Sequence, residues 1–346
     1  MSSDLIESLI SGLPLPVFLV SGDERIVHMS PAAQEMFGRA LTGRHYIGVL
    51  RQPAILDCIE ETLRLNQMRR SRYLTTEHGA DATYEVISSP VRAPDGEGAL
   101  VTLLDVSERE KAGQIRRDFV ANVSHELKTP LTALLGFIET LKGAAREDAA
   151  VRARFLDIME REAGRMNRLV SDLLSLSRVE SEERMRPSER VDIVALVHAA
   201  ALTLRSVAQD AGVALEIDTP DAPMEVQGDS DQLVQVLTNL VENGIKYGGA
   251  GGRVRIIVTH SPRELAFRGP AVRIDVVDYG EGFDPVHIPR LTERFYRVDS
   301  HRSREMGGTG LGLAIVKHIV NRHRGRFRIA SEKGQGSRFS VMLPLA

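Results

Sequence analysis

The sequence has little cysteine, few aromatic residues and no tryptophan. Cys58 is the single cysteine among 346 residues. One thiol cannot form an internal disulfide bond or a zinc site of paired cysteines, and this composition is typical of a reducing compartment. We therefore expect a cytoplasmic protein.

Long apolar runs are also missing. The most apolar early stretch, LPLPVFLV from Leu13, is short, contains two prolines and leads directly into SGDERIV. A membrane-spanning helix needs about 20 predominantly apolar residues, and a signal peptide needs a basic segment ahead of an apolar one. We expect neither in this sequence; attachment through a membrane-associated partner stays an open alternative.

An excess of positive charge is missing as well. The formal net charge is -3, which gives no electrostatic reason to expect nucleic acid as a partner. Hydrophobic residues make up 42% of the chain, enough for packed cores. The length predicts two or three domains.

Short β-branched runs alternate with turn signals in the first third of the chain. The expected strands include VFLV, RIVHM, TYEVISSPV and ALVTLLDV. Ser30 and Pro31 open a helix as N-cap and first residue. The order of strand, strand, helices and three strands resembles a PAS domain, and a structural dimerisation or spacer module is the alternative. His28, His45 and Cys58 lack the spacing of metal ligands, so we expect ordinary structural roles.

From about Glu108 to Glu183 the pattern becomes helical, with a break near Gly143–Asp148. Apolar residues recur at steps of three and four in both halves: Phe119, Val123, Leu127, Leu131, Leu134, Ile138 and Leu141, then Phe155, Met159, Met166, Leu169, Leu173 and Leu176. A hairpin of this length cannot bury its apolar stripe alone, so two copies would pair into a four-helix bundle. We therefore expect a homodimer; packing of the stripe on flanking domains is the alternative.

The first helix of this hairpin carries the segment FVANVSHELKTPLT. His125 is followed by Glu126, and a neutral imidazole is a good nucleophile toward phosphorus near neutral pH. A carboxylate that accepts the second ring N–H would hold the tautomer and stabilise the cation. Alone, such a pair is more often part of a solvated helix face. Pro130 predicts a kink beside the histidine, with or without a functional role.

Mixed strands and helices follow from about Val191 to Ala346. The expected strands are ALEID, RVRIIVTH, VRIDVVD, RFRIAS and RFSVMLP, and the expected helices cover residues 192–211, 229–247 and 311–324. Strands with helices on one face predict an α/β sandwich.

The second of these helices has a polar face. Asn239, Asn243 and Lys246 lie four and three residues apart and therefore share one side of the helix. Amide oxygens are hard ligands suited to Mg²⁺, a lysine ammonium suits phosphate, and Tyr247 is placed to pack nearby. A solvated polar stripe is the alternative.

Asp278 ends a β-branched run and is followed by Gly280 and Gly282. A carboxylate at this point can accept a hydrogen bond from the exocyclic amine of adenine, while the glycines allow a close approach of ligand and backbone. The pattern taken alone is usually just a turn.

A long polar segment between Pro285 and Met306 is typical of a lid. It carries Phe295, which we expect to anchor the lid, and Arg297, which we expect to meet the γ-phosphate of a nucleotide. Four glycines then lead into the helix LAIVK, at Gly307, Gly308, Gly310 and Gly312. Backbone N–H groups at such a helix start bind phosphates.

The histidine segment and the four boxes NLVENGIKYGG, DYGEGF, ERFYRVD and GGTGLGLAIVK resemble, in family order, the sensor histidine kinases of the HisKA type. The resemblance covers about residues 110–346, and the acceptor box is most similar to the phosphate-regulon sensors of PhoR type. It implies a Bergerat-type ATP-binding fold, as in DNA gyrase, a class of heat-shock chaperones and the mismatch-repair ATPases of MutL type.

The resemblance also implies roles for single residues. It gives His125, Glu126 and Thr129 catalytic roles, and makes Asn243 the principal Mg²⁺ ligand with support from Asn239. The implied ATP-binding residues are Asn239, Asn243, Lys246, Tyr247, Asp278, Gly280, Gly282, Arg297, Gly308, Thr309, Gly310, Leu311 and Gly312.

Gly244 stands where members of the family usually carry alanine, at a cost of about 1 kcal/mol in helix propensity, which would loosen the metal-binding helix. ATPases of the same superfamily carry a glutamate four residues before the metal-binding asparagine, where this chain has Asn239. Glu242 immediately precedes Asn243, so we expect it on a different face. Transfer to His125 is therefore favoured over hydrolysis of ATP.

We interpret the chain as an α+β protein of three domains: a PAS-like α/β domain over 1–107, a dimeric hairpin over 108–185 and a Bergerat-type α/β sandwich over 186–346. The expected function is a two-component kinase that phosphorylates His125 from Mg-ATP with Glu126 as base, then passes the phosphoryl group to a response-regulator aspartate. A signalling scaffold without catalysis and an ATP-driven conformational machine of the chaperone or MutL class are the alternatives.

Thr129 lies four positions after His125, so both side chains project from one helix face. In the resembling family the His-Glu-x-x-Thr arrangement removes the phosphoryl group from the regulator, with the hydroxyl orienting a water. We expect this second activity here. The alternative is that Thr129 only hydrogen-bonds to its own helix ahead of Pro130.

Overall fold

The computed structural model describes residues 2–38, 41–77, 80–93, 96–143, 146, 148–183, 185–299 and 308–346. The chain divides into two compact units, residues 1–121 and residues 122–346. Within the described residues, no helix is both long enough and apolar enough to cross a membrane.

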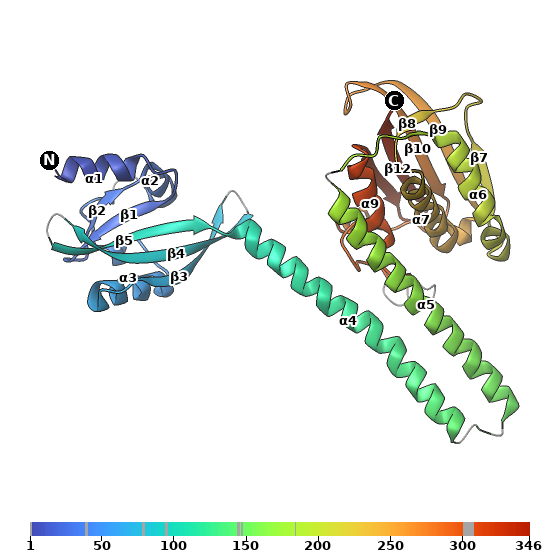
Figure 1. The fold of residues 1–346 in the computed structure, drawn as a ribbon, viewed down its shortest axis with the longest axis horizontal. Coiled ribbons are helices and arrows are strands. Elements are labelled where there is room, and N and C mark those ends of the chain that lie inside the picture. Colours follow the sequence, from blue (N-terminus) through green and yellow to red (C-terminus); the bar gives the residue numbers. More distant parts are fainter. Residues whose placement is uncertain are drawn as a thin grey trace. The chain divides into compact units, whose positions relative to one another are not determined.

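A five-stranded antiparallel sheet in the order β2-β1-β5-β4-β3 forms the centre of the first unit (Figure 1). Its strands are β1 (Val17–Ser21), β2 (Ile26–Met29), β3 (Arg69–Glu77), β4 (Ala80–Ala93) and β5 (Gly96–Asp105). The other elements are α1 (Ser2–Ser11), α2 (Pro31–Phe37), η1 (Tyr46–Gly48) and α3 (Pro53–Leu65). The predicted order of strands and helices is confirmed, and α1 is an element that the sequence pattern did not predict.

Ser30 organises the start of this unit. Its hydroxyl accepts the N–H of Ala33 at 3.2 Å, which confirms the predicted N-cap of α2. The same hydroxyl donates to the carbonyl of Leu15 at 2.7 Å and accepts the N–H of Val17 at 3.0 Å. One buried side chain therefore joins the start of α2 to the start of β1.

Two long helices form a hairpin, α4 (Ser107–Lys142) and α5 (Ala149–Glu182). The predicted break between them is confirmed, and Asp148 caps α5 by accepting the N–H groups of Ala150 and Val151, each at 3.0 Å. The rings of Phe137 and Phe155 lie 5.0 Å apart and connect the two helices. Helix α4 continues through Pro130, which is buried.

The rest of the second unit is a five-stranded mixed sheet in the order β11-β12-β10-β9-β7. Its strands are β7 (Ala214–Asp218), β9 (Arg253–Glu264), β10 (Gly269–Asp278), β11 (Arg326–Glu332) and β12 (Gly336–Pro344). Helices α6 (Ile193–Asp210), α7 (Ser230–Gly248) and α9 (Gly312–Arg322) cover one face of it (Figure 1). The small strands β6 (Arg190–Asp192) and β8 (Glu225–Gln227) pair with each other, and η2 (Gly249–Gly251) and η3 (Pro285–Arg290) are short 3-10 helices. The predicted strands and helices of this α/β sandwich are confirmed.

Candidate functional site

A cavity of about 530 Å³ lies between α7, the end of β10, the glycine-rich segment before α9 and a stretch of α5. Most residues that the sequence predicts for nucleotide binding line it: Asn239, Asn243, Lys246, Tyr247, Asp278, Gly282, Arg297, Gly308, Thr309, Gly310 and Gly312. The structure therefore brings four separated sequence boxes to one place. Gly280 and Leu311 lie beside this lining, and Gly307 falls outside the described residues.

Helix α7 presents its polar face to the cavity because its apolar residues pack on the sheet. Leu233, Leu237 and Leu240 are buried in the core. Asn239 and Asn243 are half-buried at the cavity, and the amide nitrogen of Asn239 donates to the carbonyl of Gly312 at 3.4 Å. This contact leaves the amide oxygen for a ligand, so two hard oxygen donors on adjacent turns fit Mg²⁺.

Glu242 also lines the cavity, and the expectation that it lies on a different face from the asparagines is wrong. It follows Asn239 by three residues, and a spacing of three places two side chains on neighbouring positions of one helix face. Its carboxylate accepts a hydrogen bond from the ammonium of Lys246 at 2.9 Å. Glu242 and Lys246 therefore form an ion pair at the cavity.

Asp278 ends β10 at the base of the cavity and is 4% exposed. Its carboxylate accepts the N–H of Gly280 at 3.1 Å. Burial raises the pKa of this carboxyl, while the hydrogen bonds from Gly280 and Ser337 act in the opposite direction. A β-carbon at Gly248 would lie 2.4 Å from that of Asp278, so only glycine lets the end of α7 approach the carboxylate.

The predicted lid lies only in part within the described residues, which here end at Asp299 and resume at Gly308. Phe295 has a φ of 65° and donates its backbone N–H to the carbonyl of Gly310 at 2.8 Å. A β-carbon at Gly310 would lie 2.9 Å from the α-carbon of Phe295. The start of the predicted lid therefore rests directly on the glycine-rich segment.

The phospho-acceptor segment contacts this region through Glu126. Its carboxylate pairs with Arg165 of α5 at 2.6 Å and with Arg297 at 3.1 Å, and all three side chains are largely buried. His125 is exposed on α4 and is not among the described residues that line the cavity. Arg297 thus reaches the cavity while it holds the predicted base.

Thr129 donates its hydroxyl to the carbonyl of His125 at 3.2 Å. This is the hydrogen bond to its own helix that the sequence left open as the alternative to a catalytic role. The side chain is exposed, so the hydroxyl oxygen remains accessible to solvent as an acceptor.

Comparisons with known proteins agree with this arrangement. Three family models match the chain: the PAS fold over residues 4–106, the His Kinase A (phospho-acceptor) domain over 115–182, and the histidine kinase-, DNA gyrase B- and HSP90-like ATPase over 228–346. The sensor-like histidine kinase SenX3 of Mycobacterium tuberculosis is 34% identical over 342 residues, which cover 99% of this chain and 80% of SenX3. The chain belongs to the sensor histidine kinases.

Two further relatives of this sensor histidine kinase are longer than it is. The phosphate regulon sensor protein PhoR of Pseudomonas aeruginosa is 42% identical over 242 residues, which cover 70% of this chain and 53% of PhoR. The sensor histidine kinase WalK of Bacillus subtilis is 37% identical over 249 residues, which cover 72% of this chain and 40% of WalK. The chain spans about half the length of these curated relatives.

A solved structure agrees in fold over nearly the whole kinase chain. The histidine kinase ThkA, crystallised in complex with the response regulator protein TrrA, matches with a TM-score of 0.53 and 21% identity over 98% of both chains. The fold of the kinase is thus a PAS domain, a helical phospho-acceptor region and an ATPase-type α/β domain.

The hairpin supplies a wall of the cavity that no sequence motif predicted. Asn167, Arg168, Ser171 and Asp172 of α5 line the cavity together with the nucleotide boxes. The hydroxyl of Thr309 donates to the carboxylate of Asp172 at 2.7 Å. These residues belong to no recognisable motif, and their helical spacing indicates only one face of α5.

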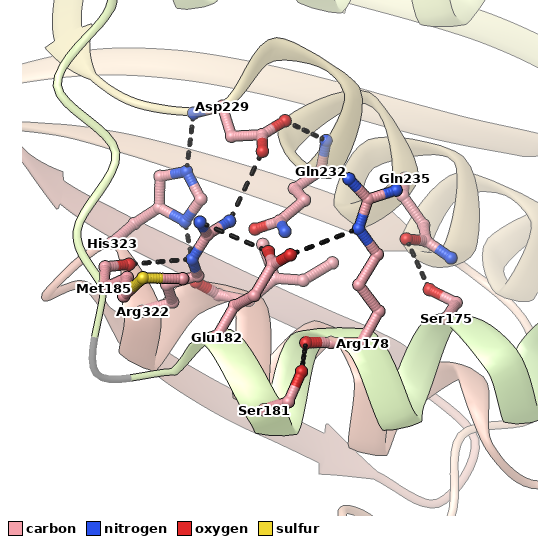
Figure 2. A network of polar contacts seen from close by, with 11 residues as sticks. Ser175, Arg178, Ser181, Glu182, Met185, Asp229, Gln232, Gln235, Arg322 and His323 are labelled. Atoms are coloured by element: carbon pink, nitrogen blue, oxygen red, sulfur yellow. Dashed lines mark hydrogen bonds and ion pairs between the residues drawn. The ribbon is translucent and has the colours of Figure 1, made fainter.

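A second contact joins the end of α5 to α7, the helix that carries Asn239 and Asn243 (Figure 2). Arg322, at the end of α9, donates to the carbonyl of Met185 at 2.9 Å and pairs with Asp229 and Glu182 at 3.3 Å each. His323 accepts the backbone N–H of Asp229, the N-cap of α7, at 2.9 Å. The ring therefore binds as a neutral acceptor, and burial lowers its pKa.

Proposed function

We propose that this chain is an ATP-dependent protein-histidine kinase that phosphorylates His125 and passes the phosphoryl group to an aspartate of a response regulator. The observation that carries the proposal is the single cavity that unites two α7 asparagines, a buried aspartate and a glycine-rich helix start. Such a donor set suits the three parts of Mg-ATP: cation, adenine and phosphates.

Each group has a chemical task in this proposal. Asn243, supported by Asn239, would hold Mg²⁺, which supplies positive charge at the phosphates when bound. Asp278 accepts the exocyclic amine of adenine, a contact that guanine cannot offer in the same place. The imidazole of His125 forms a bond to the γ-phosphorus of ATP while the bond to the bridging oxygen breaks, ADP leaves, and Glu126 accepts the ring proton.

The residue four positions before Asn243 argues against the rival reading as a simple ATPase. ATPases of the same superfamily carry a glutamate there as the base for water, and this chain has Asn239. The exposed imidazole of His125 offers a nucleophile in the same unit.

The experiment is labelling of the full chain with γ-labelled Mg-ATP. We expect one phosphorylated site that is labile in acid and stable in base, and its loss in His125→Ala with nucleotide binding unchanged. His260→Ala, which replaces an exposed histidine on β9, is the matched control and should label as the wild type does. Labelling that persists in His125→Ala would show that the acceptor is another residue.

A homodimer through the hairpin belongs to the proposal. Leu131, which belongs to the predicted stripe, and Leu135, Leu156 and Leu174, which lie outside it, are 49% to 69% exposed on α4 and α5. Leu176, near the end of α5, is buried where that helix packs against α9, so flanking elements cover part of the predicted stripe. A second hairpin would cover the exposed leucines.

We also propose that the kinase dephosphorylates its own regulator with the help of Thr129, whose exposed side chain follows His125 by one turn. Thr129→Ala should slow the decay of phosphorylated regulator in the presence of ADP and leave autophosphorylation near the wild-type rate. Thr132→Ala, at another exposed threonine of α4, is the control. If the phosphorylated regulator decays at an unchanged rate in the Thr129 variant, the hydroxyl has no role in dephosphorylation and serves only the hydrogen bond to its own helix.

The response regulator as partner and a cytoplasmic location belong to the same proposal. A response regulator is the acceptor that a phosphohistidine on an exposed helix face would serve, and ThkA was crystallised with such a protein. A cytoplasmic location, alone or with a membrane-associated partner, follows from the proposed use of ATP.

A further inference from the structure

Two carboxylates of the hairpin bind groups that the nucleotide's phosphates would otherwise use. Asp172 accepts the hydroxyl of Thr309, in the glycine-rich segment, at 2.7 Å. Glu126 accepts the guanidinium of Arg297 at 3.1 Å. Both donors line the nucleotide cavity. Carboxylate and phosphate oxygens are both strong acceptors for hydroxyl and guanidinium donors, so the same donors suit either partner.

The two carboxylates differ in their relation to the cavity. Asp172 itself lines the cavity, whereas Glu126 lies outside its lining among the described residues. Burial raises the pKa of the Asp172 carboxyl, while the Thr309 hydroxyl and the charge of Lys246 lower it. The Asp172 carboxyl group stands within the space that a triphosphate would enter.

The environment of Arg297 favours the binding of an anion in the cavity. Its guanidinium is 7% exposed, and its Nε–H is buried without a hydrogen-bond partner among the described residues. A buried donor without an acceptor costs free energy, and a phosphate oxygen in the cavity would relieve that cost. The hydroxyl of Thr309 in turn donates to Asp172 at 2.7 Å and accepts the backbone N–H of Leu311 at 3.3 Å, so its one bond to the hairpin is the bond to Asp172 among the described residues.

We propose that Asp172 competes with the triphosphate for Thr309, so that nucleotide binding releases α5 from the glycine-rich segment. The inference rests on the proposed ATP site and goes beyond it, because it makes a hairpin residue responsible for how tightly the cavity takes phosphates. Repulsion between the phosphates and the Asp172 carboxylate breaks the Thr309 bond. Loss of that bond weakens the contact between the nucleotide domain and the hairpin. This contact has to break before His125 can reach the γ-phosphate.

Asp172→Asn tests the repulsion because it keeps the shape and an acceptor oxygen but removes the charge. A charge within about 4–6 Å of an ionic group shifts its equilibrium by a factor of about ten or more. We therefore expect the full-length variant to bind the non-hydrolysable analogue AMPPNP with Mg²⁺ about tenfold more tightly. Adenosine, which has no phosphates, should bind with unchanged affinity. Asp157→Asn, at an exposed aspartate of the same helix, should match the wild type with both ligands.

Equal or weaker AMPPNP binding by Asp172→Asn, or an equal gain for adenosine, would overturn the inference. Hydrogen exchange of the wild-type chain gives a test that needs no variant: amides around Asp172 in α5 should exchange faster when AMPPNP and Mg²⁺ are added. Unchanged or slower exchange there contradicts the release. The proposed function fails separately, if the wild type neither binds AMPPNP nor labels at His125.

Discussion

Gly244 offers a test in which two opposing effects can be weighed. It lies in α7 next to Asn243, and alanine at this position would favour the helix by about 1 kcal/mol. The added methyl carbon, however, would lie 3.1 Å from both terminal carbons of Val254, a tighter contact than side chains ordinarily make. Overpacking of this kind costs about 1–3 kcal/mol.

Val254 is poorly able to move away. It is fully buried in β9, and its backbone pairs with Asp278 of β10 and with Leu215 of β7. Its β-branched side chain has a restricted χ1 angle, so relief requires a backbone shift. We therefore expect Gly244→Ala to lose about 1 kcal/mol net. Because β9 would press on the strand that carries Asp278, ATP binding should weaken as well.

The double variant separates propensity from crowding. Val254→Ala alone removes two buried methyl groups, at about 1.6 kcal/mol of transfer free energy plus a cavity term. In Gly244→Ala/Val254→Ala the alanine methyl enters the vacated space without strain, so the two changes should couple favourably by about 1–3 kcal/mol. Native-state hydrogen exchange of α7 and β9 measures these free energies locally, which suits a multidomain chain.

Stabilisation of α7 by the full propensity gain of about 1 kcal/mol in Gly244→Ala alone would contradict this expectation. That result would mean that β9 moves away from the added methyl group without loss of stability, and that packing does not require glycine at position 244. Additive single effects in the double variant would lead to the same conclusion.

Two further predictions concern buried titratable groups. In a binding assay, Asp278→Asn should lower the affinity for ATP far more than the affinity for GTP, and an equal loss for both nucleotides would make Asp278 structural. Because burial raises the pKa of Asp278, removal of its charge should also raise the melting temperature of the nucleotide-free protein near neutral pH. His323 has a pKa lowered by burial, so its contribution to stability is present above the unfolded-state value of about 6.5 and is lost as pH falls through the lower folded-state value. Unfolding curves from pH 7 to pH 5 should show this loss, and His323→Gln should flatten it.

Local sequence patterns predicted the helices and strands and many of the residues that line the cavity. Apolar spacing of three and four predicted the two hairpin helices and α7, and alternating β-branched runs predicted the strands, because these periodicities are local properties of the chain. The same local geometry placed Asn239 and Asn243 together. It also places Glu242 with them, since a spacing of three from Asn239 shares the face.

Only the tertiary structure decided which distant groups meet in the cavity. Asp172 and Thr309 are 137 residues apart, and Glu126 and Arg297 are 171 residues apart, yet each pair is in hydrogen-bonding contact. No period of a helix or strand relates such positions; the path of the chain and the docking of α5 on the α/β sandwich do. The need for glycine at position 248, at the end of α7, arises in the same way, because a β-carbon there would lie 2.4 Å from that of Asp278 in β10. Contacts of this kind depend on the packing of whole elements, whereas sequence patterns report how each element is built.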